Sequence, residues 1–241
     1  HRDLHSFPTR RSSDLDACCA RYYADDTREH MVMPKAVYIS NPTELGTLYS
    51  RREMEALREV CDRWQLILYM DGARIGYGLS AEENDLDLPT IARLCDAFYI
   101  GGTKQGMLMG EAVVLMHPSL REGFRSMIKQ KGGMLAKGRL LGLQFEEALR
   151  DGLYFELSRH AIDMAVLLRE GFRSAGCAFY VDSPTNQLFP ILSNERIEAL
   201  REHFSFEIMQ PVDENHTVTR FCTSWATRRE HVEALLEELN R

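Results

Sequence analysis

The sequence lacks the paired cysteines that would mark a zinc site or a disulfide framework. Its six cysteines lie at positions 18, 19, 61, 95, 177 and 222, and no CxxC motif occurs among them. This usage fits a reduced cytosolic protein better than a secreted one. We therefore expect a cytoplasmic location and no structural metal.

Long apolar runs and blocks of basic residues are also missing. The longest apolar stretches, such as 66–70 and 112–116, have the length of a strand, far short of the roughly 20 residues that span a bilayer. The chain has 29 Lys and Arg residues against 36 Asp and Glu residues, a net charge of −7, and no basic cluster. A membrane or a nucleic acid is therefore not expected as a partner.

The first fifteen residues, HRDLHSFPTRRSSDL, show no helical or strand period and no apolar region of a signal peptide. Residues 6–15 read like the translation of a common sequencing-adapter DNA. We interpret 1–15 as a non-native segment that replaces missing native sequence, and the alternative is a disordered basic tail.

From residue 16 onward, short apolar runs alternate with helical patterns. Strands are expected at 36–40, 66–70, 97–100 and 112–116. Ser50 and Glu53 have the spacing of a capping box at the start of a helix, and 86–94 is also expected to be helical. This alternation predicts an α/β fold with a mostly parallel sheet.

The pattern changes after residue 118. Helices are expected over 118–131, 140–149, 154–175, 195–203 and 228–240, and short strands over 177–181, 187–192, 206–209 and 217–223. We predict that 16–145 are the remainder of a large domain and that 146–241 hold linking helices and a small α+β C-terminal domain.

Unusual residues follow two of the predicted strands. Asp71-Gly-Ala-Arg74 comes after 66–70, and Gly101-Gly102-Thr103-Lys104 comes after 97–100. In open parallel sheets, ligands bind at the carboxyl ends of the strands, so neighbouring strands would bring Asp71 and Lys104 into one crevice.

These residue types suit pyridoxal 5'-phosphate. Its aldehyde needs a lysine amine, here Lys104, and its ring nitrogen needs a carboxylate, here Asp71. Thr103 and the adjacent glycines could bind part of the phosphate, and Arg74 could reach the ring oxygen or a substrate carboxylate. Singly, each residue has a plainer reading, as a turn cap, a surface charge or a structural ion pair.

Four segments carry a resemblance to a known family: YISNPTELGTLYS, YMDGARIGYGL, DAFYIGGTKQGMLMGEAVVL and IKQKGGMLAKGRLLG. Together they resemble the threonine aldolase and β-eliminating lyase family, which consists of fold-type-I pyridoxal-phosphate enzymes. The resemblance implies a large domain of the aspartate aminotransferase type, here incomplete. It also implies Lys104 as the Schiff-base lysine and Asp71 as the partner of the ring nitrogen.

The same resemblance implies that Arg74 contacts the cofactor or the substrate, and it assigns Arg220 in VTRFCTSW to the substrate carboxylate. Thr103 and Gly102 are cofactor-binding candidates from their residue types. From the residues alone, Arg220 would instead be a strand residue paired with a structural acid.

Two departures from the family stand out. The usual N-terminal phosphate-binding turn and ring-stacking residue have no counterpart in 16–35, and Thr43 stands near the place of a histidine thought to act on the substrate hydroxyl. The catalytic base is therefore left open, with Thr43 and Glu44 as candidates, although turn capping is their ordinary role. Thr43 is also expected to contact the substrate. His117 and His160 are expected to be structural or exposed.

The implied reaction is cleavage of a β-hydroxy-α-amino acid such as threonine to glycine and an aldehyde, by a homodimer or homotetramer. The alternatives are another fold-type-I lyase or aminotransferase, or an inactive fragment that lacks part of the cofactor site. For this polypeptide alone, little or no activity is expected.

Overall fold

The computed structural model describes residues 12–240. Most of the segment interpreted as non-native, 1–11, lies outside the described residues. The expectation that 1–15 have no helical structure is wrong for the last four, because α1 spans Ser12–Ala24. The helix is held in place by Leu15, which packs on the core, and by Asp16, which accepts hydrogen bonds from Arg63 and Trp64 at 2.7 Å each.

The larger sheet has the strand order β1-β2-β3-β4, with β1 at Ala36–Ser40, β2 at Ile67–Asp71, β3 at Ala97–Gly101 and β4 at Glu111–Leu115. The first three strands are parallel, and β4 runs antiparallel to β3. The connection over 102–110 is too short for the crossover that a parallel strand requires, so the chain turns back. The predicted α/β fold with a mostly parallel sheet is confirmed, and its last strand is the antiparallel exception.

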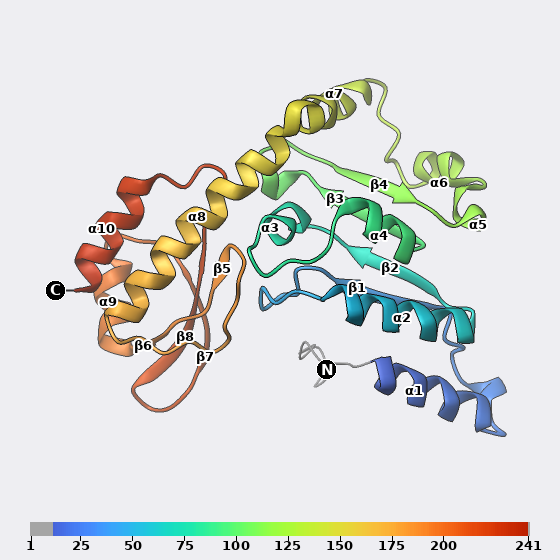
Figure 1. Cartoon of the computed structure of the whole chain (residues 1–241), viewed down its shortest axis with the longest axis horizontal. Helices are drawn as coiled ribbons and strands as arrows, with labels where there is room; N and C mark the ends of the chain where they lie inside the picture. The colour runs from blue at the N-terminus through green and yellow to red at the C-terminus, as the bar shows by residue number, and fades with distance from the viewer. Residues whose placement is uncertain (1–11, 241) are drawn as a thin grey trace.

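Helix α2, at Arg51–Trp64, packs on one face of this sheet (Figure 1). It begins at the predicted capping box, in which the Ser50 side chain accepts from the Glu53 amide and the Glu53 side chain accepts from the Ser50 amide. Its apolar residues recur at helical spacing and are buried in the core, with Met54 fully buried. The face that α2 presents to the sheet therefore follows from the sequence period.

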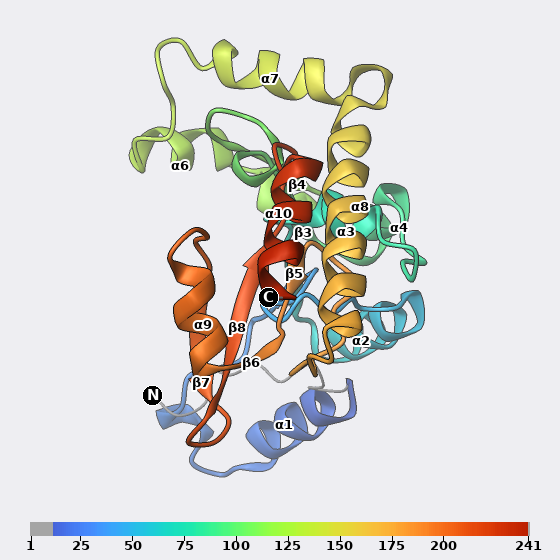
Figure 2. The same ribbon diagram turned by 90° about the vertical axis from the view of Figure 1, so that its left-hand side faces the viewer.

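The remaining helices of the first half are short, and the chain then runs into two longer ones. Their bounds are η1 Arg28–His30, α3 Ile75–Leu79, α4 Leu88–Leu94, η2 Thr103–Gln105, α5 Pro118–Arg121, α6 Phe124–Gln130, α7 Arg139–Leu149, η3 Arg150–Gly152 and α8 Leu153–Ser174. Helices α6 and α7 lie at one end of the molecule (Figure 2), and α8 runs from there to the second half of the chain (Figure 1). Among residues 12–240, no helix is long and apolar enough to cross a membrane.

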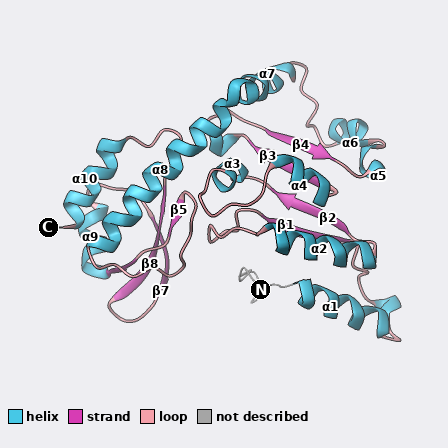
Figure 3. Ribbon diagram, viewed as in Figure 1, coloured by secondary structure: helices cyan, strands magenta, loops and turns pink. Residues whose placement is uncertain are grey.

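The second half forms a smaller sheet in which β8, at His216–Cys222, is the shared strand (Figure 3). Strand β8 pairs with β5 (Gln187–Leu188), β6 (Ile191–Ser193) and β7 (Glu207–Pro211), and all three pairings are antiparallel. Helices α9 (Asn194–Arg201) and α10 (Arg229–Leu239) pack against this unit.

Two strand predictions fail at the same residue, Pro190. The segment 177–181 is not a strand but makes one isolated bridge, Phe179 to Pro190, and the predicted strand 187–192 is split into β5 and β6. Proline has no amide hydrogen to donate, so the ladder is interrupted on both sides of that position.

The part of the chain that the structure describes contains two large hydrophobic clusters. The first surrounds the larger sheet and reaches Tyr154 at the start of α8, and the second surrounds the smaller sheet and includes Met164, Leu168 and Phe172 of the same helix. Helix α8 thus contributes to both clusters, and the boundary at 145/146 stays a prediction.

The nearly buried ion pair between Arg58 and Asp96 fastens α2 to the sheet. Asp96 Oδ2 accepts from Arg58 Nη1 at 2.8 Å and from the Leu68 amide at 2.7 Å, and the two side chains are 17% and 13% exposed. Arg58 also pairs with Asp62, whose side chain is 68% exposed.

We predict that Asp96→Ala lowers the free energy of unfolding by about 3 kcal/mol, because it leaves a nearly buried guanidinium without its main partner. The matched control is Asp62→Ala, which removes the exposed partner of the same arginine and should cost below about 1 kcal/mol. Urea unfolding followed by circular dichroism measures both, and equal losses would contradict the assignment.

Candidate functional site

Asp71 and Lys104 lie at the same edge of the larger sheet. Asp71 is the last residue of β2, and Lys104 is in η2, three residues after β3 ends at Gly101. The positive charge of Lys104 contributes to lowering the pKa of Asp71, so the two groups interact electrostatically. The two residues therefore share one edge of the sheet, as the sequence predicts, and a crevice that holds both stays a prediction.

Hydrogen bonds hold the Asp71 carboxylate in place. The Tyr38 hydroxyl donates to Oδ2, the Tyr99 hydroxyl donates to Oδ1, and the Ala73 amide donates to Oδ1 at 3.0 Å. Burial by itself raises the pKa of Asp71, but these three donors and Lys104 outweigh it, so the pKa lies below its usual value. The group is thus a fixed carboxylate that stays charged at neutral pH.

The backbone that carries Lys104 is fixed while its side chain is exposed. The Tyr77 hydroxyl donates to the Lys104 carbonyl, and the Tyr154 hydroxyl donates to the Gly101 carbonyl at 2.8 Å. Tyr77 belongs to α3 and Tyr154 to α8, so two helices position this loop. An exposed amine on a rigid loop is suited to covalent attachment.

Two further bonds tie the same loop to its surroundings. The fully buried Gln105 amide group is hydrogen-bonded to Ser158 of α8 at 2.7 Å. The Gly102 amide donates to Glu111 Oε2 at 2.6 Å, so this amide is already engaged. Thr103 is exposed beside it.

The glycines at this edge allow close backbone packing. A Cβ on Gly101 would lie 2.3 Å from the Ala73 carbonyl oxygen, and one on Gly102 would lie 2.4 Å from the Gly110 carbonyl oxygen. From the sequence, these glycines are expected to bind part of the cofactor phosphate together with Thr103. In the structure, the side of each glycine on which a side chain would stand contacts neighbouring backbone. A contact between Gly102 and the cofactor stays a prediction.

Arg74 is a half-buried cation at the start of α3, and its guanidinium makes no hydrogen bond or ion pair within residues 12–240. Its charge acts on Cys222, as do the charges of Lys104 and Arg220. Burial nevertheless raises the pKa of the Cys222 thiol above its usual value. The end of β8 therefore faces the edge that carries Arg74 and Lys104.

Arg220 is the predicted carboxylate-binding residue, and in the structure it pairs with an acid of the adjacent strand. Its Nη2 lies 2.5 Å from Glu207 Oε2, and its buried Nε has no partner in the described part of the chain. The pairing with a strand acid, the plainer reading of this residue, is thus present. The unused Nε leaves the guanidinium able to donate to a second group.

Thr43 is buried in the turn after β1, and its hydroxyl oxygen lies 2.7 Å from Thr47 Oγ1. The same turn is tied to the second half of the chain, because Ser183 and Thr185 donate to the Gly46 carbonyl at 3.2 and 3.1 Å. The Thr43 hydroxyl is engaged within the turn, and its contact with a substrate stays a prediction.

The two histidines expected to be structural have structural partners. His160 Nε2 lies 2.7 Å from the Thr227 carbonyl oxygen, and His117 caps α5 by accepting from the Ser119 amide. That expectation is confirmed.

The sequence interpretation missed Tyr38 and Tyr99, the two donors to Asp71. A signal was available, because side chains alternate in a strand and the tyrosines stand in the middle of the AVYIS and AFYIG strands. Glu207 was also missed, since nothing in the sequence pairs β7 with β8.

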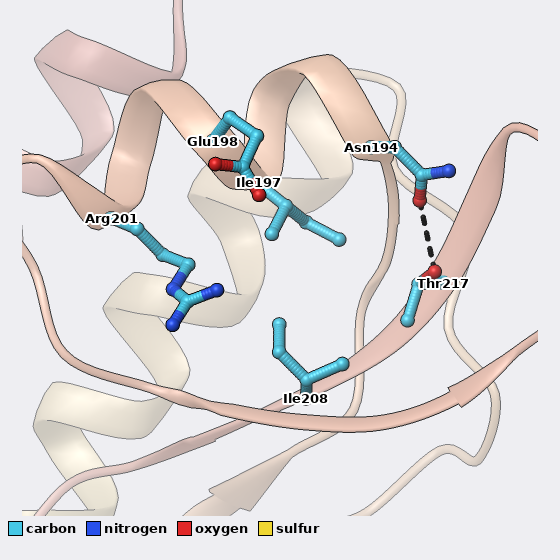
Figure 4. A pocket seen from close by; sticks show the side chains of 6 residues that line it. All are labelled: Asn194, Ile197, Glu198, Arg201, Ile208 and Thr217. Carbon is cyan, nitrogen blue, oxygen red and sulfur yellow. Dashed lines mark hydrogen bonds between the residues drawn. The ribbon is translucent and has the colours of Figure 1, made fainter.

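A hollow between α9 and strands β7 and β8 lies apart from these residues (Figure 4). It is lined by Asn194, Ile197, Glu198, Arg201, Ile208 and Thr217. Thr217 donates to Asn194 at 2.9 Å across one end of it. None of the predicted site residues lines it.

Comparisons with a family model and with curated proteins lead to the same family. The family model described as beta-eliminating lyase matches residues 5–195. The low specificity L-threonine aldolases of Pseudomonas aeruginosa and of a Pseudomonas species are 31% and 29% identical to this chain over 214 residues. Those matches cover 87% of this chain, which spans 60% of the length of these relatives.

Solved structures agree with these matches. A Leishmania major threonine aldolase superposes with a TM-score of 0.92 at 42% identity, covering 96% of this chain and 66% of that one. A Sphingomonas wittichii serine palmitoyltransferase superposes with a TM-score of 0.66 at 14% identity, covering 95% of this chain and 58% of that one, and it shares the fold alone.

The packing of the glycines predicts the effect of adding a methyl group. Gly101→Ala should lower the free energy of unfolding by about 2–3 kcal/mol, because backbone must move to admit the Cβ. The control is Gly142→Ala in exposed α7, where a Cβ meets nothing within 4 Å and should stabilise by up to about 1 kcal/mol. Urea unfolding measures both, and a neutral Gly101→Ala would refute the packing argument.

Proposed function

This chain belongs to the beta-eliminating lyase family, and from that premise we propose that it binds pyridoxal 5'-phosphate and cleaves β-hydroxy-α-amino acids such as threonine to glycine and an aldehyde. The observation that carries the proposal is the placement of a charged carboxylate, Asp71, and an exposed amine, Lys104, at one sheet edge. Relatives named as low specificity L-threonine aldolases support the choice of substrate.

The residues at this edge fit the cofactor in their chemistry. Lys104 supplies the amine to which the aldehyde bonds, on a backbone that Tyr77 and Tyr154 hold still. Asp71 supplies the negative charge that a protonated ring nitrogen requires, and its lowered pKa suits that task. Thr103 is exposed beside Lys104 and offers a hydroxyl to the phosphate, with Gly102 adjacent to it.

The bound cofactor supplies an electron sink for the bond that breaks at the substrate Cα. The chain's own residues bind and orient the substrate. Arg74, a cation with no partner among the described residues, is placed to bind the ring oxygen or the substrate carboxylate. We propose that the planar guanidinium of Arg220 binds that carboxylate through two hydrogen bonds while it stays paired with Glu207. Thr43 is proposed to lie near the substrate hydroxyl.

Location and assembly belong to the same proposal. We propose that the enzyme acts in the cytoplasm as a homodimer or homotetramer on a small amino-acid substrate. Sedimentation of the purified protein measures the assembly, and a monomer at all concentrations would contradict it.

Lys104 is tested by trapping the cofactor. After addition of pyridoxal 5'-phosphate and reduction with borohydride, the mass of the cofactor should stay on the peptide that contains Lys104. Lys104→Ala should abolish this label, whereas Lys137→Ala, which removes another exposed lysine, should retain it. A label on any other lysine in the wild-type protein would refute the assignment.

The reaction is tested by its products. Incubation of the cofactor-loaded protein with threonine should release glycine and acetaldehyde in equal amounts, at a low rate because little activity is expected of this polypeptide alone. Release of ammonia with a keto acid would indicate elimination, and a keto acid without ammonia would indicate transamination. Either result would overturn the proposed cleavage.

A further inference from the structure

Three tyrosines form a row across the parallel strands on the face that carries Asp71. Tyr38 is the register partner of Tyr69, and the Tyr69 ring lies 5.3 Å from the Tyr38 ring and 6.4 Å from the Tyr99 ring, centroid to centroid. Asp71 follows Tyr69 by two residues and therefore lies on the same face. The two outer tyrosines converge on this carboxylate, and the Tyr69 hydroxyl makes no hydrogen bond with the described residues.

The two carboxylate oxygens are used unequally. Oδ1 accepts from the Tyr99 hydroxyl and from the Ala73 amide, so both of its lone pairs are occupied. Among residues 12–240, Oδ2 accepts only from the Tyr38 hydroxyl, so one of its acceptor positions is free of the described residues. A further donor can therefore bind Asp71 without displacing any of its present partners.

The tyrosines act as donors throughout the neutral pH range. Desolvation and the adjacent carboxylate raise the pKa of Tyr99, and they also raise the pKa of Tyr38, although Tyr38 stays 64% exposed and its desolvation is only partial. Neither phenol therefore loses its proton in this range. Besides these two, the charged or titratable groups that act on Asp71 are Lys104 and Tyr69. Each hydrogen bond from a phenol stabilises the charged carboxylate and weakens it as a base.

We propose that Tyr38 and Tyr99 are positioning residues for Asp71, which hold its carboxylate charged and oriented so that the free acceptor position on Oδ2 receives the protonated ring nitrogen of the cofactor. This inference rests on the proposed function and deepens it. A carboxylate with two phenol donors competes poorly for the proton between it and the ring nitrogen, so that proton stays on the nitrogen.

The substitutions Tyr38→Phe and Tyr99→Phe remove one donor each and keep the ring row. Tyr69→Phe is the matched control, because it lies between them in the same row and loses a hydroxyl that does not contact Asp71. Thermal unfolding of all three variants checks that the sheet is intact.

The first measurement needs no cofactor. The carboxyl ¹³C resonance of Asp71, assigned by its loss in Asp71→Asn, is titrated in the unliganded proteins. Tyr38→Phe and Tyr99→Phe should each raise the titration midpoint by about one pH unit, the size of one charge-assisted hydrogen bond, and Tyr69→Phe should not. Midpoints equal to that of Tyr69→Phe would overturn the inference.

The second measurement reads the ring nitrogen directly, by the ¹⁵N chemical shift of labelled pyridoxal 5'-phosphate bound to each protein. The wild type and Tyr69→Phe should show a protonated nitrogen. Tyr38→Phe and Tyr99→Phe should show a shift toward the unprotonated value and a dissociation constant raised about tenfold. A fully protonated nitrogen with unchanged affinity in both variants would overturn the inference.

These two measurements separate the possible failures. If the midpoints move as expected but the wild type takes up no cofactor, the tyrosine donors are upheld and the proposed function fails. If the wild type binds cofactor and the two variants behave like Tyr69→Phe, the function stands and the positioning role is wrong.

Discussion

The charged carboxylate of Asp71 is the group on which the rest of the site depends. Burial alone would favour its neutral form, and a neutral acid could not hold a protonated ring nitrogen. The structure offsets this cost with two phenol donors, one amide and the charge of Lys104. All of these partners come from strands β1 and β3 or from the residues that follow β2 and β3, so the parallel register is what assembles them.

The loop that carries Lys104 is held from several directions. The hydroxyls of Tyr77 in α3 and Tyr154 in α8 donate to the carbonyls of Lys104 and Gly101. Glu111 accepts from the Gly102 amide, and the glycines allow close contact between the adjoining strand ends. The backbone is therefore rigid although the amine is exposed. Such a loop fixes where a covalent bond can form without limiting access of the reacting partner.

The cationic side chains near this edge differ in whether an acidic side chain neutralises their charge. Lys104 acts on Asp71, Arg74 has no partner within residues 12–240, and Arg220 is paired with Glu207. The partly exposed guanidinium of Arg74 stays available to an anion. Arg220 is balanced in the unliganded chain, so a substrate carboxylate would have to share it with Glu207.

The α/β alternation, the capping box at Ser50 and the placement of Asp71 and Lys104 at one sheet edge could be predicted from the sequence. Strand periods and cap spacing are local, and the rule that ligands bind at the carboxyl ends of parallel strands is general. The register that brings Tyr38 and Tyr99 to Asp71, and the pairing of β7 with β8 that brings Glu207 to Arg220, came from the tertiary structure. Those depend on which strands become neighbours and in what register, and pairing between distant segments leaves no trace in local periodicity.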